Sequence, residues 1–362
     1  MLTKFSLSRL LGTARTSGRN ALAICQKFPQ QTIRSFALLF AVGLGLTLAI
    51  SACSANTSDN QGTTPAGSRN AAVSSTLVRI GYQKASTILY ALKVKGELEK
   101  LTASGVSVTW SEFPAGPPML EALNAGSIDF GYTGEAPPIF AQAAGIPLVY
   151  VAYDPWSTKA EAILVPKDSP IKSVAELKGK KVAFVKGSNV NYLLVKALSK
   201  AGIEYSEIQP VTLSPADARA VFEGKKVDAW AIWDPYLAAA EAATGARILT
   251  DATGLAANRG YYLAAKSFVD KHPDALNIVL DQVKKVSGWA KNNPAEVAKL
   301  LSPALGIDAS VLELAEKRHE YDVLPLTEEV ISKQQEVADT FYKINLIPKQ
   351  IKVKEIVWQG KQ

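Results

Sequence analysis

The feature that most constrains the fold is a regular alternation of short apolar runs and amphipathic segments from Leu77 to about Ala246. The apolar runs predict strands, and the segments between them predict helices. The strands are expected at 77–82, 106–113, 127–133, 147–153, 160–166, 180–187, 211–213 and 227–233, and the helices at 86–101, 116–125, 139–145, 191–202, 215–224 and 234–243. After about Lys266 the pattern is largely helical, with an amphipathic stretch at 273–291. The sequence therefore predicts a doubly wound α/β protein with mainly parallel sheets.

The strand-forming region divides into two similar halves, one before Pro166 and one from Ile171 to Ala246, and the helical remainder can close back on the first half. Two α/β lobes joined by crossovers leave a cleft between them. In open α/β sheets, ligands bind beyond the carboxyl ends of the strands. We therefore expect the ligand site in this cleft.

The N-terminal segment has the parts of a secretory signal. Residues 1–52 carry six Lys and Arg and no Asp or Glu, and the apolar run Phe36–Ile50 is shorter than the ~20 residues that span a membrane. The run ends in Ile50-Ser51-Ala52-Cys53, which resembles a lipobox, so Cys53 is predicted to be lipidated and to become the mature N-terminus. Residues 53–75 are polar and small, and we expect them to form a flexible tether. An ordinary signal peptide or an uncleaved anchor is the alternative.

Composition argues against other classes of protein. Removing the six cations of residues 1–52 from the net charge of +7 leaves about +1 for the rest, so no nucleic-acid partner is expected. The two histidines, His272 and His319, have no Cys or carboxylate at metal-ligand spacing, and His319 lies in a charged segment that we expect to be solvated. Glu135 and Asp234 could form an acid–base pair, but carboxylates in such loops are usually caps. We therefore expect neither an enzyme nor a cofactor.

The chemistry-bearing residues recur where predicted strands pass into predicted helices. These junctions read Gln83-Lys84-Ala85-Ser86, Ala115-Gly116-Pro117, Thr133-Gly134-Glu135, Gly187-Ser188-Asn189 and Trp233-Asp234-Pro235. Helix N-termini have free N–H groups and the positive end of the helix dipole, and so favour anions. Five of them facing one cleft would suit a small tetrahedral oxyanion (sulfonate, sulfate or phosphate), held by hydroxyls and amides without a buried Lys or Arg. Plain capping is the alternative at each single junction.

The same junctions carry a family resemblance. The segments IGYQKAS, EFPAGPPMLEALNAGSIDFGYTGEAPPIFAQAAG, LVYVAYDP, IQPVTLSPADARA and VDAWAIWDPY resemble the aliphatic sulfonate-binding proteins of bacterial ABC importers. The resemblance runs from about Val78 to Gln359. It implies a type II periplasmic-binding-protein fold with lobe 1 at 76–164 and 262–362, lobe 2 at 165–261, and crossovers near 163–167 and 258–264. It also implies a monomer that captures an alkanesulfonate and delivers it to a membrane permease with a separate ATPase.

The resemblance assigns the ligand-binding residues one by one. In lobe 1 they are Gln83, Ser86, Gly116, Thr133 and Gly134, with Thr133 and Gly134 the foremost candidates for the sulfonate head. In lobe 2 they are Ser188, Asn189 and Trp233, with Asp234 orienting the loop. The loop after Gly187 departs from the family, which often has more Ser and His there, whereas this chain has Asn189-Val190-Asn191. Taurine, nitrate or a pyrimidine precursor is the alternative ligand, and Glu135 or Asp234 could serve the ammonium of taurine.

Overall fold

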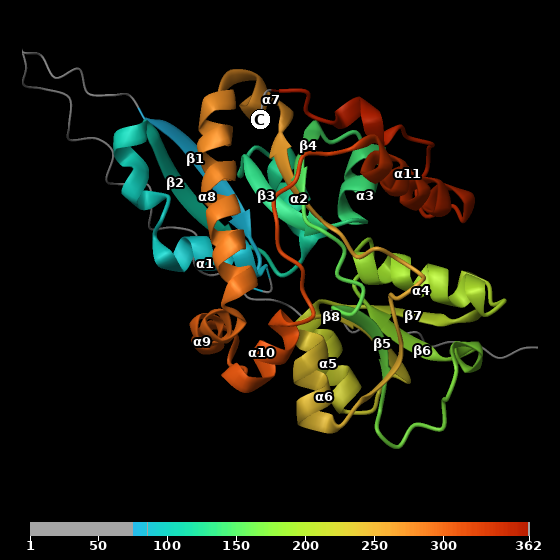
Figure 1. The fold of residues 1–362 in the computed structure, drawn as a ribbon. Coiled ribbons are helices and arrows are strands. Elements are labelled where there is room, and N and C mark those ends of the chain that lie inside the picture. Colours follow the sequence, from blue (N-terminus) through green and yellow to red (C-terminus); the bar gives the residue numbers. More distant parts are fainter. Residues whose placement is uncertain (1–74, 85, 361–362) are drawn as a thin grey trace, which may run out of the picture. The chain divides into compact units, whose positions relative to one another are not determined.

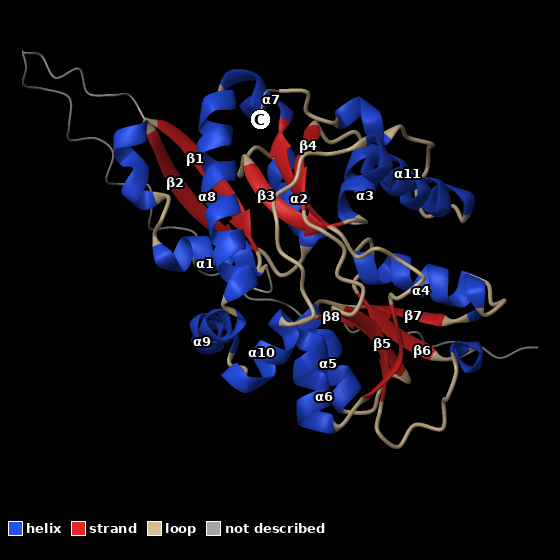
Figure 2. Ribbon diagram, viewed as in Figure 1, coloured by secondary structure: helices blue, strands red, loops and turns tan. Residues whose placement is uncertain are grey.

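Two five-stranded sheets organise the part of the chain that the structure, a computed structural model, describes, namely residues 75–84 and 86–360 (Figure 1; Figure 2). These residues fall within one compact unit. The predicted signal peptide, Cys53 and nearly all of the predicted tether lie outside the described residues.

The first sheet has the strand order β2-β1-β3-β10-β4. Its strands are β1 (Thr76–Tyr82), β2 (Val106–Glu112), β3 (Phe130–Gly134), β4 (Leu148–Tyr153) and β10 (Gly260–Ala265). β1 pairs in parallel with β2 and β3, whereas β10 is antiparallel to both β3 and β4. Four of the five strands therefore run in the same direction.

The second sheet repeats this plan in the order β7-β6-β8-β5-β9. Its strands are β5 (Glu161–Val165), β6 (Lys181–Phe184), β7 (Gln209–Thr212), β8 (Ala229–Trp233) and β9 (Arg247–Asp251). β6 pairs in parallel with β7 and β8, and β5 is antiparallel to β8 and β9. The predicted doubly wound, mainly parallel architecture is confirmed, with one antiparallel strand added to each sheet.

Helices cover both sheets. Around the first sheet lie α1 (Thr87–Lys95), α2 (Gly116–Asn124), α3 (Pro137–Ala143), α7 (Lys266–Lys271), α8 (Pro273–Asn292) and α11 (Glu328–Lys343), and around the second lie α4 (Asn189–Lys200), α5 (Pro215–Glu223) and α6 (Tyr236–Thr244) (Figure 1). α9 (Pro294–Leu305) and α10 (Ala309–Glu316) follow α8, and α10 packs on α6. Short 3₁₀ helices occur at Glu99–Ser104, Val174–Leu177, Tyr205–Glu207 and Val353–Ile356.

Local sequence explains where these helices begin and end. Proline occupies the first turn of α2, α3 and α5, where a missing N–H costs nothing. α1 and α6 end at Gly96 and Gly245, whose φ values of 61° and 64° are readily adopted only by glycine. Strands such as β4 and β8 are almost wholly buried, as Tyr150 and Trp230 illustrate with 0% exposure each, whereas Leu77 in β1 and Ile248 in β9 are exposed at 49% and 40%.

The crossovers between the sheets lie upstream of the expected positions. All of β5 pairs within the second sheet and all of β10 within the first, so the expected boundaries at 164/165 and 261/262 cut through strands. The chain changes sheet at 154–160 and again at 252–259. The apolar run of β5 predicted a strand correctly, but a buried run carries no signal for the sheet in which it pairs.

Candidate ligand-binding cleft

A partly open cavity of about 80 Å³ lies between the two sheets, at the carboxyl ends of their parallel strands. Its walls come from the starts of α1, α2, α3 and α4, from the turn before α6, and from both crossovers. Eight of the nine residues assigned from sequence line it, namely Gln83, Ser86, Gly116, Gly134, Ser188, Asn189, Trp233 and Asp234. The structure therefore brings together strand ends that are up to 151 positions apart in the chain.

Several helices begin at this cavity, and in α6 the Ala238 amide of the first turn already donates to Asp234 Oδ1. The N-cap residues of α1, α2, α4 and α6 make no side-chain cap hydrogen bond. The Ser188 hydroxyl, at the start of α4, donates to the Val185 carbonyl at 2.7 Å instead. Ser214 and Thr327 cap α5 and α11, which lie outside the cavity, whereas α7, α8, α9 and α10, whose residues do not line it, also lack a side-chain cap. Free N–H groups and helix dipoles at one cavity make it suited to an anion.

Thr133 does not reach the cavity. Its side chain is 1% exposed, and its Oγ1 donates to the Gly134 carbonyl at 2.9 Å. Side chains alternate along a strand, so Tyr132 and Gly134 line the cavity while Thr133 points to the other face of β3. There it packs close to Gly116, because a Cβ added to Gly116 would lie 3.1 Å from Thr133. Thr133 thus supports the wall from behind.

Gly134, at the end of β3 in the first lobe, and Asn189, at the start of α4 in the second lobe, lie close together across the cleft. A Cβ added to Gly134 would lie 2.7 Å from Asn189 Oδ1. The Asn189 amide donates to Glu161 Oε2 at 2.6 Å and to Asn258 Oδ1 at 2.8 Å. Glu161 is 0% exposed, and burial raises the pKa of its carboxyl group well above the ordinary value. This network ties α4 to β5 and to the second crossover.

Asp234 is held firmly in the turn before α6. Its Oδ1 accepts from the Ala238 amide at 3.0 Å, and its carboxylate pairs with Arg318 at 3.4 Å. It is 1% exposed, and burial raises its pKa to about 6 despite the opposing attraction of Arg318. These contacts are those of a residue that orients its loop.

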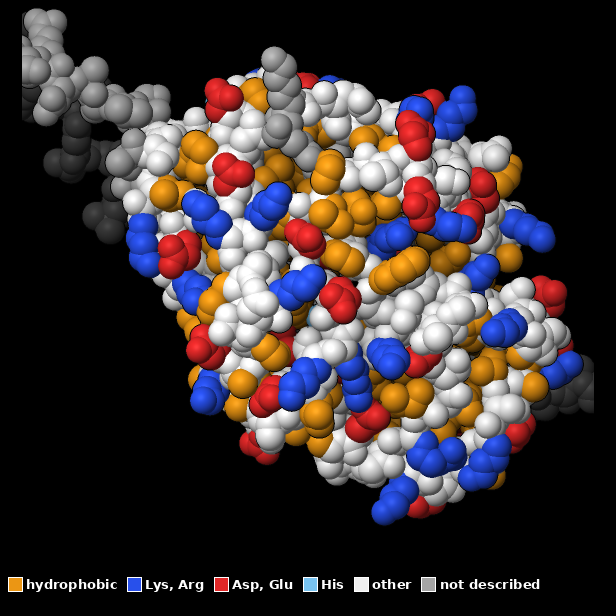
Figure 3. Space-filling model, in the orientation of Figure 1, with side chains coloured by type: hydrophobic (Ala, Val, Ile, Leu, Met, Phe, Trp, Pro, Cys, Tyr) orange, Lys and Arg blue, Asp and Glu red, His pale blue; other side chains and the backbone are white. Residues whose placement is uncertain are grey.

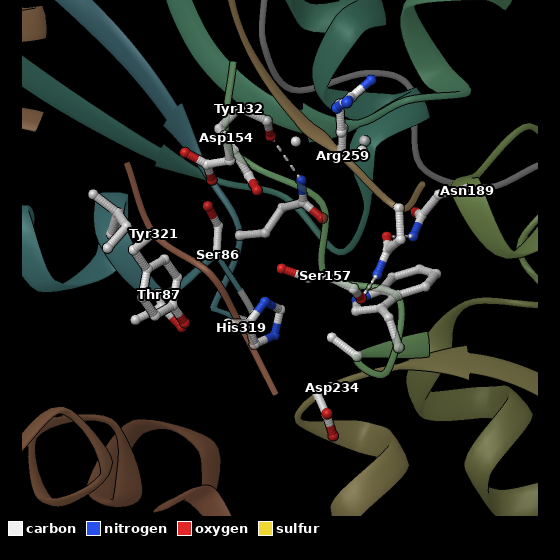
Figure 4. A pocket seen from close by; sticks show the side chains of 18 of the residues that line it. Ser86, Thr87, Tyr132, Asp154, Ser157, Asn189, Asp234, Arg259, His319 and Tyr321 are labelled. Carbon is white, nitrogen blue, oxygen red and sulfur yellow. Dashed lines mark hydrogen bonds between the residues drawn. The ribbon is translucent and has the colours of Figure 1, made fainter. Parts of the chain in front are cut away.

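Several lining residues were not found from sequence, namely Thr87, Asp154, Ser157, Arg259, His319 and Tyr321 (Figure 4), and in addition Asn258. Asp154 directly follows β4, so the strand-end rule applied to the other junctions could have found it. His319 lies in a segment whose Lys317 and Glu320 are exposed as expected, but its own side chain is half-buried, lines the cavity and stacks on Tyr321 with ring centroids 5.6 Å apart. Burial lowers its pKa to about 4, so it is neutral at physiological pH.

Arg259 corrects the expectation of a site without a buried cation. It lies just before β10, is 7% exposed, and its Nε and Nη1 have no partner. Its guanidinium stacks near the rings of Tyr153 and Trp156, at 5.7 and 5.4 Å from their centroids. Figure 4 shows the guanidinium directed away from Ser86 and His319. The cation therefore contributes positive charge at the rim of the cavity.

The described residues offer little for other chemistry. They contain no group of three or more His, Cys, Asp and Glu placed to hold a metal ion. Within the same part of the chain, no helix is long and apolar enough to cross a membrane.

Two α/β lobes with a cavity between them that polar strand ends help to line define a substrate-binding protein of the two-lobed class. Residues 101–297 match the family model described as NMT1/THI5 like. The chain is 46% identical over 286 residues to a protein of Escherichia coli (strain K12) named for binding aliphatic sulfonates, covering 79% of this chain and 89% of the relative. It is 36% identical over 283 residues to the protein of that name from Bacillus subtilis (strain 168), covering 77% of this chain and 85% of the relative.

Among solved structures, the chain is similar to the alkanesulfonate-binding protein SsuA from Xanthomonas axonopodis pv. citri bound to MOPS. The TM-score is 0.75 at 41% identity, covering 78% of this chain and 98% of that chain. The chain belongs to the family of aliphatic sulfonate-binding proteins. The family and the fold implied by the resemblance are confirmed.

Proposed function

We propose that this protein captures aliphatic sulfonates outside the cytoplasm and delivers them to the permease of an ABC importer, driven by a separate ATPase. The observation that carries the proposal is the cavity lined by helix starts that lack side-chain caps. A sulfonate is a tetrahedral oxyanion that accepts several hydrogen bonds at once, so it matches convergent N–H and hydroxyl donors. The names and identities of the relatives support this ligand class.

Binding is coupled to closure of the two lobes. The sulfonate docks on the starts of α1 and α2, and α4 and the turn before α6 close over it, with Asp234 orienting that turn. Ligand binding then favours the closed state because only that state offers both sets of contacts. The permease would recognise the closed form, and the protein would act as a monomer without a cofactor.

The N-terminal segment places the protein at a membrane. Residues 1–52 act as a signal peptide, Cys53 carries a lipid, and 53–75 tether the lobes 76–160 plus 252–362 and 161–251 to the extracytoplasmic surface. Charge supports a small-molecule partner over nucleic acid, since Lys and Arg are interspersed with Asp and Glu on the face shown in Figure 3. Without Cys53 the protein should leave the membrane fraction.

A binding panel tests the ligand class. The full chain in nonionic detergent would be heated with ethanesulfonate, taurine, sulfate, nitrate, phosphate or a pyrimidine. A ligand at 100 times its dissociation constant stabilises the fold by about 2.7 kcal/mol. Stabilisation by sulfonates supports the proposal. Stabilisation by nitrate or the pyrimidine alone would contradict the sulfonate assignment and make that compound the proposed ligand.

Two serine variants test the site. Ser188→Ala should weaken ethanesulfonate binding at least about tenfold, because this hydroxyl lies at the start of α4 in the cavity. Ser214→Ala is the matched control, since it removes a hydroxyl at the start of α5 outside the cavity and costs only about 1 kcal/mol of stability. Equal binding by both variants would contradict the site.

A further inference from the structure

A second pocket, of about 290 Å³, lies between α4 of the second lobe and α11 of the first, and both crossovers also line it. Trp156 and Thr158 come from the first crossover, and residues 254–257 come from the second. The pocket shares only Arg259 with the ligand cavity, which is smaller at about 80 Å³. We call it the crossover pocket, and sulfonate capture leaves it without a role.

Two of the three cations that line the crossover pocket form no ion pair within the described residues. Arg259 is 7% exposed, and its Nε and Nη1 have no hydrogen-bond partner. Its Nη2 bonds to no described residue either but, unlike the other two nitrogens, is open to solvent. Lys196 of α4 is half-buried, and its ammonium group lies 6.0 Å from the centre of the Tyr192 ring. Lys333 of α11, the third cation, pairs with Glu336 at 2.7 Å.

Glu135 is the remaining carboxyl group of the crossover pocket, and it cannot neutralise both unpaired cations. Its Oε2 accepts from the backbone amide of Arg259 at 3.5 Å, and its Oε1 has no hydrogen-bond partner among the described residues. Burial raises the pKa of Glu135 to about 7, so the carboxyl group is partly protonated at neutral pH. At most one negative charge therefore faces two cations, and the pocket favours an anion.

Aromatic side chains lie beside the unpaired cations. Trp156 is 60% exposed, and its ring centre lies 5.4 Å from the guanidinium carbon of Arg259. Tyr192, Tyr261 and Leu255 also line the pocket. Small-molecule sites combine such apolar walls with a few placed charges. A planar guanidinium matches a flat carboxylate, and the face of a Trp ring packs against another flat ring.

We propose that the crossover pocket is a second ligand site, which binds a small aromatic carboxylate. The carboxylate group faces Arg259 and Lys196, and the ring of the ligand packs against Trp156. The inference goes beyond the proposed function and does not depend on it. Figure 4 shows the Arg259 guanidinium directed away from Ser86 and His319, so a carboxylate in this pocket and a sulfonate in the ligand cavity should bind at the same time.

Calorimetry on the full chain in nonionic detergent tests the inference, with benzoate as the probe and ethanesulfonate present at saturation. We expect benzoate to bind under these conditions, and benzamide, which has the same ring without the charge, to bind at least about tenfold more weakly. Lys196→Gln should weaken benzoate binding about fivefold or more, because it removes one of the two unpaired cations.

Lys200→Gln is the matched control, since it removes an exposed cation one turn further along α4 that does not line the pocket. This variant should bind benzoate like the unmodified protein. Both lysine variants should bind ethanesulfonate normally, because neither residue lines the ligand cavity. Arg259→Gln should lose benzoate binding, and if that variant does not fold, the two lysine variants decide the question.

Distinct outcomes separate this inference from the proposed function. Absence of benzoate binding, displacement of benzoate by ethanesulfonate, or equal binding of benzamide would overturn the inference. Equal benzoate affinities in Lys196→Gln and Lys200→Gln, or retained affinity in a folded Arg259→Gln, would also overturn it. If ethanesulfonate does not bind, the proposed function fails, and the benzoate affinities of the lysine variants still decide this inference.

Discussion

Replacing Gly134 with alanine tests whether the contact across the cleft controls ligand binding. The backbone of Gly134 is not in the left-handed region, so alanine strains nothing locally. Its Cβ would, however, lie 2.7 Å from Asn189 Oδ1 and 2.8 Å from Asn189 Cγ, which is closer than real Cβ contacts. In the arrangement of the lobes seen here, the Asn189 side chain must therefore move.

The cost of that movement follows from the partners of Asn189. Its amide donates at 2.6 Å to Glu161, which is fully buried and whose Oε1 already has no partner, and at 2.8 Å to Asn258. Loss of both bonds, leaving a buried carboxyl group without a donor, costs about 2–3 kcal/mol. If this free-energy cost applies only to the ligand-bound, closed state, the affinity for ethanesulfonate falls roughly 30- to 150-fold.

Calorimetry on Gly134→Ala, Asn189→Ala and the double variant measures this coupling. Truncating Asn189 removes the two atoms nearest the new methyl group, so Gly134→Ala should then cost little further affinity. Gly288→Ala, in α8 with nothing within 4 Å of the added Cβ, is the control and should bind normally with stability raised by up to about 1 kcal/mol. Unchanged affinity in Gly134→Ala, or equal losses in both backgrounds, would refute the reasoning.

Three further predictions concern stability and location. Burial raises the pKa of Glu135 and Glu316 from 4.5 to about 7, so the folded protein keeps protons that the unfolded chain releases in this range. The free energy of unfolding, measured with urea, should therefore fall as the pH rises from about 4.5 to about 7. The fall should be less steep in Glu316→Gln. Arg318→Met leaves Asp234 buried without its cation and should cost about 1–3 kcal/mol at pH 8 but less at pH 5, where Asp234 is mostly protonated; an equal loss at both pH values would contradict this. Cys53→Ser should move the exported protein from the membrane to the soluble fraction on ultracentrifugation, and membrane retention would argue for an uncleaved anchor.

Much of the cavity could be predicted from single junctions. Gln83, Ser86, Ser188, Asn189 and Asp234 each follow a strand and open a helix, and parallel strands bring such junctions to one edge of a sheet. The rule locates the end of β3 but not the direction of each side chain, which alternates from one residue to the next along a strand. It therefore assigned Thr133 to the cavity, whereas its neighbours Tyr132 and Gly134 line it. Asp154 also follows a strand, so the same rule extends to it.

Other residues carried no local signal. Arg259 and His319 reach the cavity from the second crossover and from the segment after α10, neither of which is a strand-to-helix junction. The position of Arg259 depends on the pairing of β10 in the first sheet, and that of His319 on how α10 packs against α6. A charged segment such as that around His319 reads as solvated until the packing is known.

The sequence by itself determined the alternating strands and helices, the two lobes and the polar character of the strand ends, because periodicity, helix starts and strand ends are local properties of the chain. Tertiary structure alone decided that β5 pairs in the second sheet and not in the first, that Thr133 points away from the cavity, and that Asp154 lines it. The physical reason is that strand pairing and charge compensation are set by neighbours distant in the chain, which only the packed fold brings together.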